Sequence, residues 1–327
     1  MEQRTLGRTG RPVSVVGLGT WQLGADWGTV EPDAALAILD ASVRAGVTLL
    51  DTADVYGDGR SERLIGEFLA TGDRGDVLVA TKMGRRAEQR PENFTLDNFR
   101  AWTDRSRENL RVDTLDLVQL HCPPTPVFGT DEVYDALDTL VAERRIAAYG
   151  VSVETCDEAL AAIARPNVAS VQIILNAFRR KPLERVLPAA RTAGVGIIAR
   201  VPLASGLLTG KFRADTRFAA DDHRNYNRQG GSFDVGETFS GVDYETGLAA
   251  AEEFAGLLPA GVTPAAAALR WVIQQPGVTT VIPGASTVEQ AAGNAAAADL
   301  PALPEPTLTA IEELYDRRIR AQVHHRW

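Results

Sequence analysis

Eight short apolar runs, each followed by a segment with helical periodicity, constrain the fold of this chain more than any other feature. Each run is apolar on both faces, which is typical of strands buried in a parallel sheet beneath a layer of helices. Eight is the number of alternating strand and helix units that closes such a sheet into a ring. The sequence therefore predicts an α/β fold, a (β/α)8 TIM barrel. The predicted strands lie near residues 15–19, 47–51, 77–81, 115–120, 147–152, 171–175, 196–200 and 278–282.

Two segments depart from this alternation. Residues 4–16, "RTLGRTGRPVSVV", hold a GRTG turn between two short extended pieces, which predicts an N-terminal β-hairpin over the N-terminal face of the barrel. Residues 213–246 are polar and glycine-rich and are too long for an ordinary connection after the seventh strand. This long loop is either a lid or cofactor clamp over the barrel mouth, or a disordered insertion. No repeat or linker divides the chain, so we expect a single domain over residues 1–327.

The composition narrows the class of ligand. The 327 residues carry a formal net charge of −9 and no basic run, which argues against nucleic acid or an anionic membrane as the main partner. No stretch approaches the roughly 18 consecutive apolar residues of a membrane span, and the first residues are too polar for a secretory signal. The two cysteines, Cys122 and Cys156, fit no metal-binding or disulfide pattern. We therefore expect a cytoplasmic protein that binds a small molecule and no metal, in an unknown oligomeric state.

Four ionisable side chains follow three consecutive predicted strands. Asp51 ends the second strand and Tyr56 follows it, while Lys82 and His121 end the third and fourth strands. Each has an ordinary structural explanation: a helix cap, a packed ring, a lysine that reaches solvent, or a hydrogen-bonded core histidine. The C-terminal ends of barrel strands, however, carry the active sites of this fold. The coincidence of four such groups at that end predicts a catalytic site.

These four groups, called the tetrad below, form a chemically coherent set. The Lys82 ammonium is expected to stabilise the Tyr56 phenolate and so to lower the pKa of Tyr56 from about 10, which would make it a tuned general acid. Asp51 supplies the counter-charge that a buried ammonium needs. His121 can donate a hydrogen bond to a substrate oxygen. Such a site polarises a carbonyl group, but it has no nucleophile and no metal ligands, so the reducing equivalent must come from a cofactor.

Six motifs of the chain resemble those of the aldo-keto reductase family. They are LDTADVYG (50–57), VATKMG (79–84), DLVQLH (116–121), YGVS (149–152), PLASGLLTGKF (202–212) and IPGASTVEQAAGN (282–294). The resemblance implies the barrel described above, a nicotinamide cofactor, either NADP(H) or NAD(H), and Asp51, Tyr56, Lys82 and His121 as catalytic residues. It also implies that hydride passes from the nicotinamide to the carbonyl carbon while Tyr56 protonates the oxygen.

The resemblance also assigns binding residues. Trp21, Tyr56 and His121 are expected to contact the substrate. Apart from the resemblance, the aromatic residues Trp21 and Trp27 and residues 213–246 are expected either to border the substrate pocket or to cover the cofactor. The cofactor-binding set is Thr20, Trp21, Asp51, Ser152, Gln172, Arg200, Leu203, Ser205, Gly206, Lys211, Gly284, Ser286, Thr287, Gln290 and Asn294.

The sequence departs from the family pattern at several cofactor positions. Val153 replaces an asparagine, Arg200 replaces the aromatic residue that stacks on nicotinamide, and Val201 replaces a serine. A guanidinium plane can also cover a ring, so Arg200 keeps a place in the set. Residues 284–298 contain no Lys or Arg, whereas many relatives bind the 2′-phosphate of NADPH there. The preference between NADPH and NADH therefore stays open.

Three functions fit this set of residues. The first is an NAD(P)H-dependent reductase of aldehydes or ketones, with a carbonyl compound or a sugar as substrate. The second is a sugar or alcohol dehydrogenase that runs the same reaction in the oxidative direction. The third is a nicotinamide-binding regulatory subunit that acts through a partner protein. The remaining histidines, His223, His324 and His325, lie in polar or terminal segments and are expected to be exposed to solvent.

Overall fold

One parallel sheet of eight strands, β3 to β10, forms the centre of the molecule, which confirms the predicted parallel arrangement. The computed structural model describes residues 1–24, 30–72, 76–220 and 222–327. Each strand of the sheet overlaps one of the eight predicted runs. The strands are β1 Gln3–Thr5, β2 Pro12–Ser14, β3 Leu18–Gly19, β4 Leu49–Asp51, β5 Leu78–Met83, β6 Leu117–His121, β7 Tyr149–Ser152, β8 Val168–Ile174, β9 Gly196–Arg200 and β10 Thr280–Val281.

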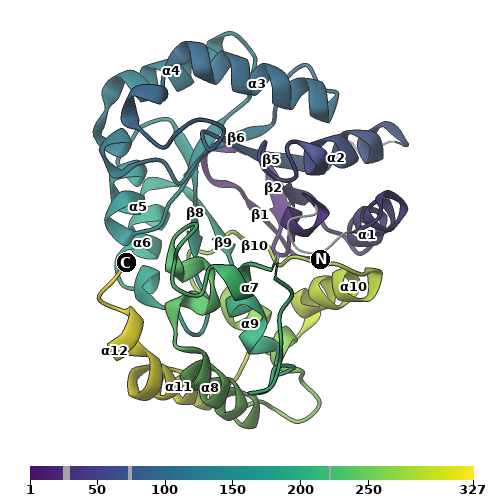
Figure 1. Cartoon of the computed structure of the whole chain (residues 1–327), viewed down its shortest axis with the longest axis vertical. Coiled ribbons are helices and arrows are strands. Elements are labelled where there is room, and N and C mark those ends of the chain that lie inside the picture. Colours follow the sequence, from purple (N-terminus) through teal and green to yellow (C-terminus); the bar gives the residue numbers. More distant parts are fainter. Residues whose placement is uncertain (25–29, 73–75, 221) are drawn as a thin grey trace.

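Backbone contacts join the first and last strands of this sheet. Val16 pairs with Val281 and Gly19 pairs with Gly284, both in parallel orientation. The Gly17 N–H donates to the Val281 carbonyl oxygen at 2.8 Å. The sheet therefore curls until its two edges meet, and Figure 1 shows the strands at the centre with helices around them. This arrangement agrees with the (β/α)8 barrel that the sequence predicts.

The surrounding helices pack on the sheet through apolar stripes. In α1, Pro32 occupies the first turn, and Ile38 and Leu39 are buried against the strands. In α5, Thr155 and Glu158 form a reciprocal capping box that fixes the start of the helix. No helix in the described part of the chain is long and apolar enough to cross a membrane. The α-helices are α1 Pro32–Arg44, α2 Arg60–Ala70, α3 Leu96–Leu110, α4 Asp131–Ala142, α5 Cys156–Ile163, α6 Val186–Ala193, α7 His223–Tyr226, α8 Tyr244–Gly256, α9 Pro264–Ile273, α10 Val288–Ala296, α11 Glu305–Leu314 and α12 Arg320–Val323.

The N-terminal end of the barrel is filled by side chains. Strands β1 and β2 pair antiparallel, and Leu6 between them is fully buried in an inner cluster with Leu49 and Leu117. Gly7 beside it has φ +48°, and a Cβ atom there would lie 2.1 Å from the Ala169 carbonyl oxygen. Only glycine therefore permits this close approach. These side chains therefore close the interior of the barrel at this end.

At the opposite end, strand pairing brings the predicted polar residues onto one rim. Asp51 is the last residue of β4. Lys82 of β5 pairs with Gln119 of β6, and His121 of β6 pairs with Ser152 of β7. Parallel strands end at the same edge, so these side chains share one rim.

Residues 213–246 connect β9 to α8 on that same side. The described part of this segment holds α7 and two short 3-10 turns, Val235–Glu237 and Phe239–Gly241. Its side chains His223, Phe233 and Glu237 line the same cavity as Asp51. The segment therefore forms part of the cavity wall at the C-terminal rim.

Candidate active site

A buried ion pair forms the floor of the site. The Lys82 Nζ donates to Asp51 Oδ1 at 2.5 Å and to the Thr52 carbonyl oxygen at 2.9 Å. The Lys82 and Asp51 side chains are 1% and 4% exposed. Burial, the largest single influence, would lower the pKa of Lys82, but the charges of Asp51 and Tyr56 and their hydrogen bonds together raise the pKa above the usual value. Lys82 therefore keeps its proton, as the sequence predicts.

Two glutamines complete the environment of the Asp51 carboxylate. Gln172 Nε2 donates to Asp51 Oδ2 at 2.7 Å, and Gln119 Nε2 approaches the same oxygen at 3.3 Å. Both glutamines are buried. Gln172, predicted to bind the cofactor, thus also fixes the counter-ion of Lys82. The sequence patterns do not single out Gln119. It lies two residues before His121 in the same strand, so both side chains point to the same face of the sheet.

The Tyr56 ring lies above this pair because of a tight turn after β4. Gly57 has φ +57°, and a Cβ atom there would lie 2.0 Å from the Gly24 carbonyl oxygen. The turn sets the Tyr56 ring centroid 5.3 Å from Lys82 Nζ and 6.0 Å from the Trp21 ring centroid, with the two rings at 21°. Tyr56 and Lys82 are therefore neighbours across two strands, as the sequence predicts.

The predicted lowering of the Tyr56 pKa is wrong in its net direction. Burial disfavours the phenolate and raises the pKa of Tyr56 above 10, although the Lys82 ammonium acts in the opposite sense. At neutral pH, Tyr56 therefore holds its proton firmly. What Lys82 provides is a positive charge that reduces the cost of releasing that proton.

His121 stands beside Tyr56 as a neutral imidazole. The two ring centroids are 5.9 Å apart and the rings are nearly perpendicular. Burial, followed by the charges of Arg85, Lys82 and Arg200, holds the pKa of His121 well below 6.5. The His121 Nδ1 atom is buried and has no hydrogen-bond partner among the described residues. A neutral histidine in this place is suited to hydrogen-bond a substrate oxygen.

A cavity of about 660 Å³ opens above the tetrad, within the size range of small-molecule sites. Lys82 lies beneath Tyr56 rather than in the cavity wall, and Thr287 caps α10 by accepting a hydrogen bond from the Gln290 N–H at 3.2 Å. The other predicted site residues line the cavity. They are Thr20, Trp21, Asp51, Tyr56, His121, Ser152, Gln172, Arg200, Leu203, Ser205, Gly206, Lys211, Gly284, Ser286, Gln290 and Asn294.

One wall of the cavity is formed by a strained loop after β9, residues 201–206, called the β9 loop below. Ala204, Ser205 and Gly206 have φ values of +48°, +55° and +98°. Val201 also has a positive φ, +53°, which is unfavourable for a β-branched residue. Two N–H groups of this loop are used within it, since the Ala204 N–H donates to the Val201 carbonyl oxygen at 3.1 Å and the Gly206 N–H donates to the Leu203 carbonyl oxygen at 2.9 Å. Lys211 also lines the cavity, and its ammonium can bind an anion such as a pyrophosphate.

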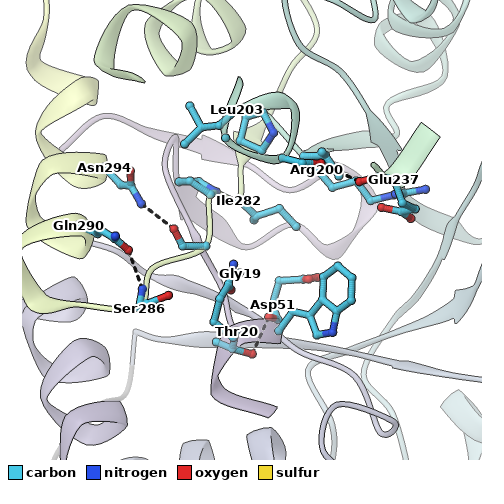
Figure 2. Close-up of a pocket in the computed structure, with 18 of the residues that line it drawn as sticks. Gly19, Thr20, Asp51, Arg200, Leu203, Glu237, Ile282, Ser286, Gln290 and Asn294 are labelled. Atoms are coloured by element: carbon cyan, nitrogen blue, oxygen red, sulfur yellow. Dashed lines mark hydrogen bonds and ion pairs between the residues drawn. The ribbon is translucent and has the colours of Figure 1, made fainter. Parts of the chain in front are cut away.

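The far end of the cavity is formed by α10 and carries neutral and acidic groups. Gln290 Oε1 accepts from the Ser286 N–H at 2.8 Å, and Asn294 Nδ2 donates to the Gly284 carbonyl oxygen at 3.1 Å. Figure 2 shows these residues on the opposite side of the cavity from Arg200 and Glu237. Glu289 adds a carboxylate to this wall. The amide and hydroxyl groups suit an adenosine moiety, while this part of the wall offers a 2′-phosphate no cation.

Arg200 lies at the predicted place, but its guanidinium is held by carboxylates. It forms ion pairs with Glu237 and with Glu154, the latter at 3.0 Å. Neither glutamate was singled out in the sequence, because Glu154 lies 46 residues before Arg200 and Glu237 lies 37 residues after it. The pairs hold Arg200 at the cavity wall, where it lies among the residues that a nicotinamide ring would contact.

The predicted exposure of His223 is wrong. Its side chain is 1% exposed and lies between Trp21 and Phe233, with ring centroids 5.3 Å and 6.3 Å away. The polar, glycine-rich context of His223 gave no sign of this aromatic cluster. Trp21 lines the cavity as predicted, whereas Trp27 lies outside the described residues.

A further carboxyl group, Asp54, is buried close to the tetrad. Asp54 is fully buried, and neither carboxylate oxygen has a hydrogen-bond partner within the described ranges. Burial, and then the nearby charge of Glu62, raises the pKa of Asp54 from 3.8 to about 7. The folded protein therefore keeps this proton at pH values where the unfolded chain has lost it.

Stability is consequently expected to fall as the pH rises from about 4 to about 7, because the folded state binds more protons than the unfolded state in this window. At pH 8 the buried charge of Asp54 lowers the free energy of unfolding by on the order of 4 kcal/mol, because its pKa rises from 3.8 to about 7 on folding, and Asp54→Asn should remove that loss. Urea unfolding at pH 4 and pH 8 checks this. At pH 8 the free energy of unfolding of Asp54→Asn should exceed that of wild type, and at pH 4 the difference should be much smaller. Asp299→Asn, at an exposed position, is the control. Parallel pH profiles for Asp54→Asn and wild type would contradict the assignment.

The parallel barrel, the buried Lys82–Asp51 pair beneath Tyr56 and the similar proteins described next place the chain among the oxidoreductases. The chain belongs to the aldo/keto reductase family, whose family model matches residues 15–316. It is 31% identical over 316 residues to the uncharacterized oxidoreductase YqkF of Bacillus subtilis, covering 95% of this chain and 96% of the relative.

Solved structures of similar proteins have the same fold. The glycerol dehydrogenase AKR11B4 from Gluconobacter oxydans is 31% identical with a TM-score of 0.76, over 94% of this chain and 93% of that one. An aldo-keto reductase from Klebsiella pneumoniae in complex with NADPH is 26% identical with a TM-score of 0.72, over 96% of both chains. The chain is also 29% identical to a probable voltage-gated potassium channel subunit beta of Oryza sativa, over 95% of this chain and 96% of that one.

Proposed function

We propose that this protein is an NAD(P)H-dependent reductase that converts aldehydes or ketones to alcohols. The observation that carries the proposal is the placement of Tyr56 above the buried Lys82–Asp51 pair, beside His121, in a cavity that continues to the β9 loop and Lys211. The solved relative from Klebsiella pneumoniae that contains NADPH supports this cofactor class. When bound, the nicotinamide would supply the hydride.

The residues of the chain have separate roles in this mechanism. His121, as a neutral donor, orients the carbonyl oxygen of the substrate. As the carbonyl carbon accepts the hydride, its oxygen takes the Tyr56 proton, and the alcohol forms. The Lys82 ammonium stabilises the developing phenolate, and Asp51 keeps the ammonium charged. Trp21 and the outer residues of the cavity exclude water from the reacting groups.

In this proposal, the β9 loop and α10 hold the other parts of the dinucleotide. Ser205 and Gly206, with Lys211, bind the pyrophosphate. Ser286, Gln290 and Asn294 meet the adenosine end. The absence of Lys and Arg between residues 284 and 298 weakens the case for the 2′-phosphate, so NADH is expected to bind at least as well as NADPH.

The test is an absorbance assay of nicotinamide oxidation with a panel of aldehydes, ketones and sugars, each run with NADH and with NADPH. Turnover with at least one carbonyl compound supports the proposal. A folded protein that binds either reduced dinucleotide and turns over none of the panel would count against reductase activity.

Two other functions have specific support. The similarity to a glycerol dehydrogenase favours the oxidative direction, which assays with NAD(P)⁺ and polyols or sugars distinguish from reduction. The similarity to a probable channel subunit favours a regulatory role. Slow single-turnover oxidation of bound NADPH together with co-purification of one partner would favour that role.

We further propose that residues 1–327 fold as a single domain, because one hydrophobic cluster extends from Val15 to Trp327.

A further inference from the structure

A cluster of buried charges lies at the wall of the cavity, beyond the tetrad. Arg200 ends β9 and is 7% exposed. Its guanidinium donates to Glu237, and also to Glu154 Oε2 and to the Val153 carbonyl oxygen, both at 3.0 Å. Burial alone would lower the pKa of Arg200, but Glu237 and then Glu154 outweigh it and hold the pKa well above the usual value. Arg200 is therefore a fixed positive charge whose partners come from two other segments. Figure 2 shows it beside Glu237.

The charges of this cluster reach the reacting groups. The charge of Arg200 contributes to the low pKa of His121, and the charge of Glu237 contributes to the raised pKa of Tyr56. On the proposed function, a nicotinamide ring must lie close enough to Tyr56 and His121 to reach the same carbonyl group. The ring would therefore lie within the electrostatic field of Arg200 and Glu237.

Glu237 is also linked to the β9 loop through Ser205. The Ser205 hydroxyl donates to the Glu237 carbonyl oxygen at 2.8 Å and accepts from the Phe239 N–H at 3.0 Å. Ser205 and Gly206 hold left-handed backbone conformations, which persist only where the surroundings fix them. Glu237 thus contacts Arg200 through its carboxylate and Ser205 through its backbone, and so joins two parts of the cavity.

We propose that Glu237 is a positioning residue for the dinucleotide, whose carboxylate balances Arg200 at the nicotinamide end and whose carbonyl oxygen fixes Ser205 at the pyrophosphate end. The inference rests on the proposed function for the position of the cofactor. It has an electrostatic consequence, because the oxidised nicotinamide ring carries a positive charge and the reduced ring carries none. Loss of the Glu237 carboxylate makes the ring site more positive by one charge and so disfavours the oxidised cofactor.

The test compares the Kd values of NADP⁺, NADPH, NAD⁺ and NADH, measured by quenching of tryptophan fluorescence, in wild type and Glu237→Gln. A unit charge near the ring at an intermediate effective dielectric gives a roughly 10-fold or larger rise in the ratio of oxidised to reduced Kd. The Kd of the reduced forms should rise by only about 3-fold, because the Ser205 loop is held less firmly. Glu237→Asp keeps the charge and should restore the wild-type ratio.

Glu253→Gln is the matched control. Glu253 on α8 also contacts two arginines, Arg317 and Arg318, but it does not line the cavity. This variant should leave all four Kd values unchanged. A melting temperature recorded for each variant separates loss of stability from loss of affinity.

Each other outcome has a defined meaning. A lower melting temperature in Glu237→Gln, with oxidised and reduced Kd values changed equally or not at all, would overturn the inference in favour of a structural role. If Glu237→Gln does not fold, the double variant Arg200→Gln/Glu237→Gln is measured instead, because it removes both charges. A ratio of oxidised to reduced Kd that is equal to or lower than that of wild type supports the charge balance. A higher ratio in the folded double variant would overturn it. If wild type binds no dinucleotide, the proposed function fails and the inference fails with it; if wild type binds and the ratio is unmoved in Glu237→Gln, only the inference fails.

Discussion

Tyr56→Phe is expected to lower kcat by about 10²- to 10⁴-fold, the usual contribution of a positioned general acid. The phenylalanine ring keeps the packing against Trp21 and removes only the hydroxyl group, so the Kd of the dinucleotide should change little. Steady-state kinetics with the best carbonyl substrate of the panel, together with fluorescence titration of NADPH, measures both quantities.

Tyr134→Phe is the control for loss of a buried tyrosine hydroxyl. Tyr134 lies on α4, outside the cavity, and its hydroxyl donates to the Phe128 carbonyl oxygen in a long contact of 3.4 Å. This variant should keep wild-type kcat. Full activity in Tyr56→Phe would exclude the phenol as the proton donor, and equal losses in both variants would point to a general loss of folding.

Lys82→Met is expected to lower the free energy of unfolding by about 3–5 kcal/mol, because it leaves the Asp51 carboxylate buried without its counter-charge. Gln119 and Gln172 donate to Asp51, but neutral donors do not replace an ammonium. Activity should also fall, since no positive charge remains beneath the Tyr56 ring. Urea unfolding at pH 7 measures the loss of stability.

Two further variants test whether the loss of stability in Lys82→Met comes from the buried, unpaired charge of Asp51 rather than from the loss of an ion pair alone. The double variant Asp51→Asn/Lys82→Met removes both charges and should recover most of the stability lost in the single variant. Arg44→Met breaks an exposed pair with Asp40 and should cost less than about 1 kcal/mol. A double variant as unstable as Lys82→Met would contradict the account of the buried pair.

The sequence predicts the parallel barrel and the proximity of the four tetrad side chains because both depend on short-range patterns. Continuous apolar runs mark the strands, and the final residues of those runs must share one rim once the strands are parallel. Gln119 falls in such a run and follows the same logic, since it faces the same way as His121. The prediction rests on ionisable side chains at strand ends, and a glutamine has no ionisable group, so this criterion does not select Gln119.

The rest of the site depends on contacts between segments far apart in the chain. Glu237 meets Arg200 only after residues 213–246 fold back over the rim, and no local pattern in that polar, glycine-rich stretch indicates the contact. The burial of His223 against Trp21 arises in the same way. The direction in which the pKa of Tyr56 shifts depends on the balance between burial, which raises it, and the charge of Lys82, which lowers it. The extent of burial is known only from the packed structure.

The most direct test of the central claim is transfer of deuterium from the cofactor to the substrate. Wild-type protein is incubated with the best carbonyl substrate of the panel and with NADH or NADPH deuterated at one of the two C4 positions, and the alcohol is analysed by mass spectrometry. The account predicts one deuterium on the carbinol carbon for each dinucleotide oxidised, from one C4 position only, with no transfer above background in Tyr56→Phe over the same time. An alcohol whose carbon-bound hydrogen comes from the solvent, or that forms without oxidation of the dinucleotide, would contradict it.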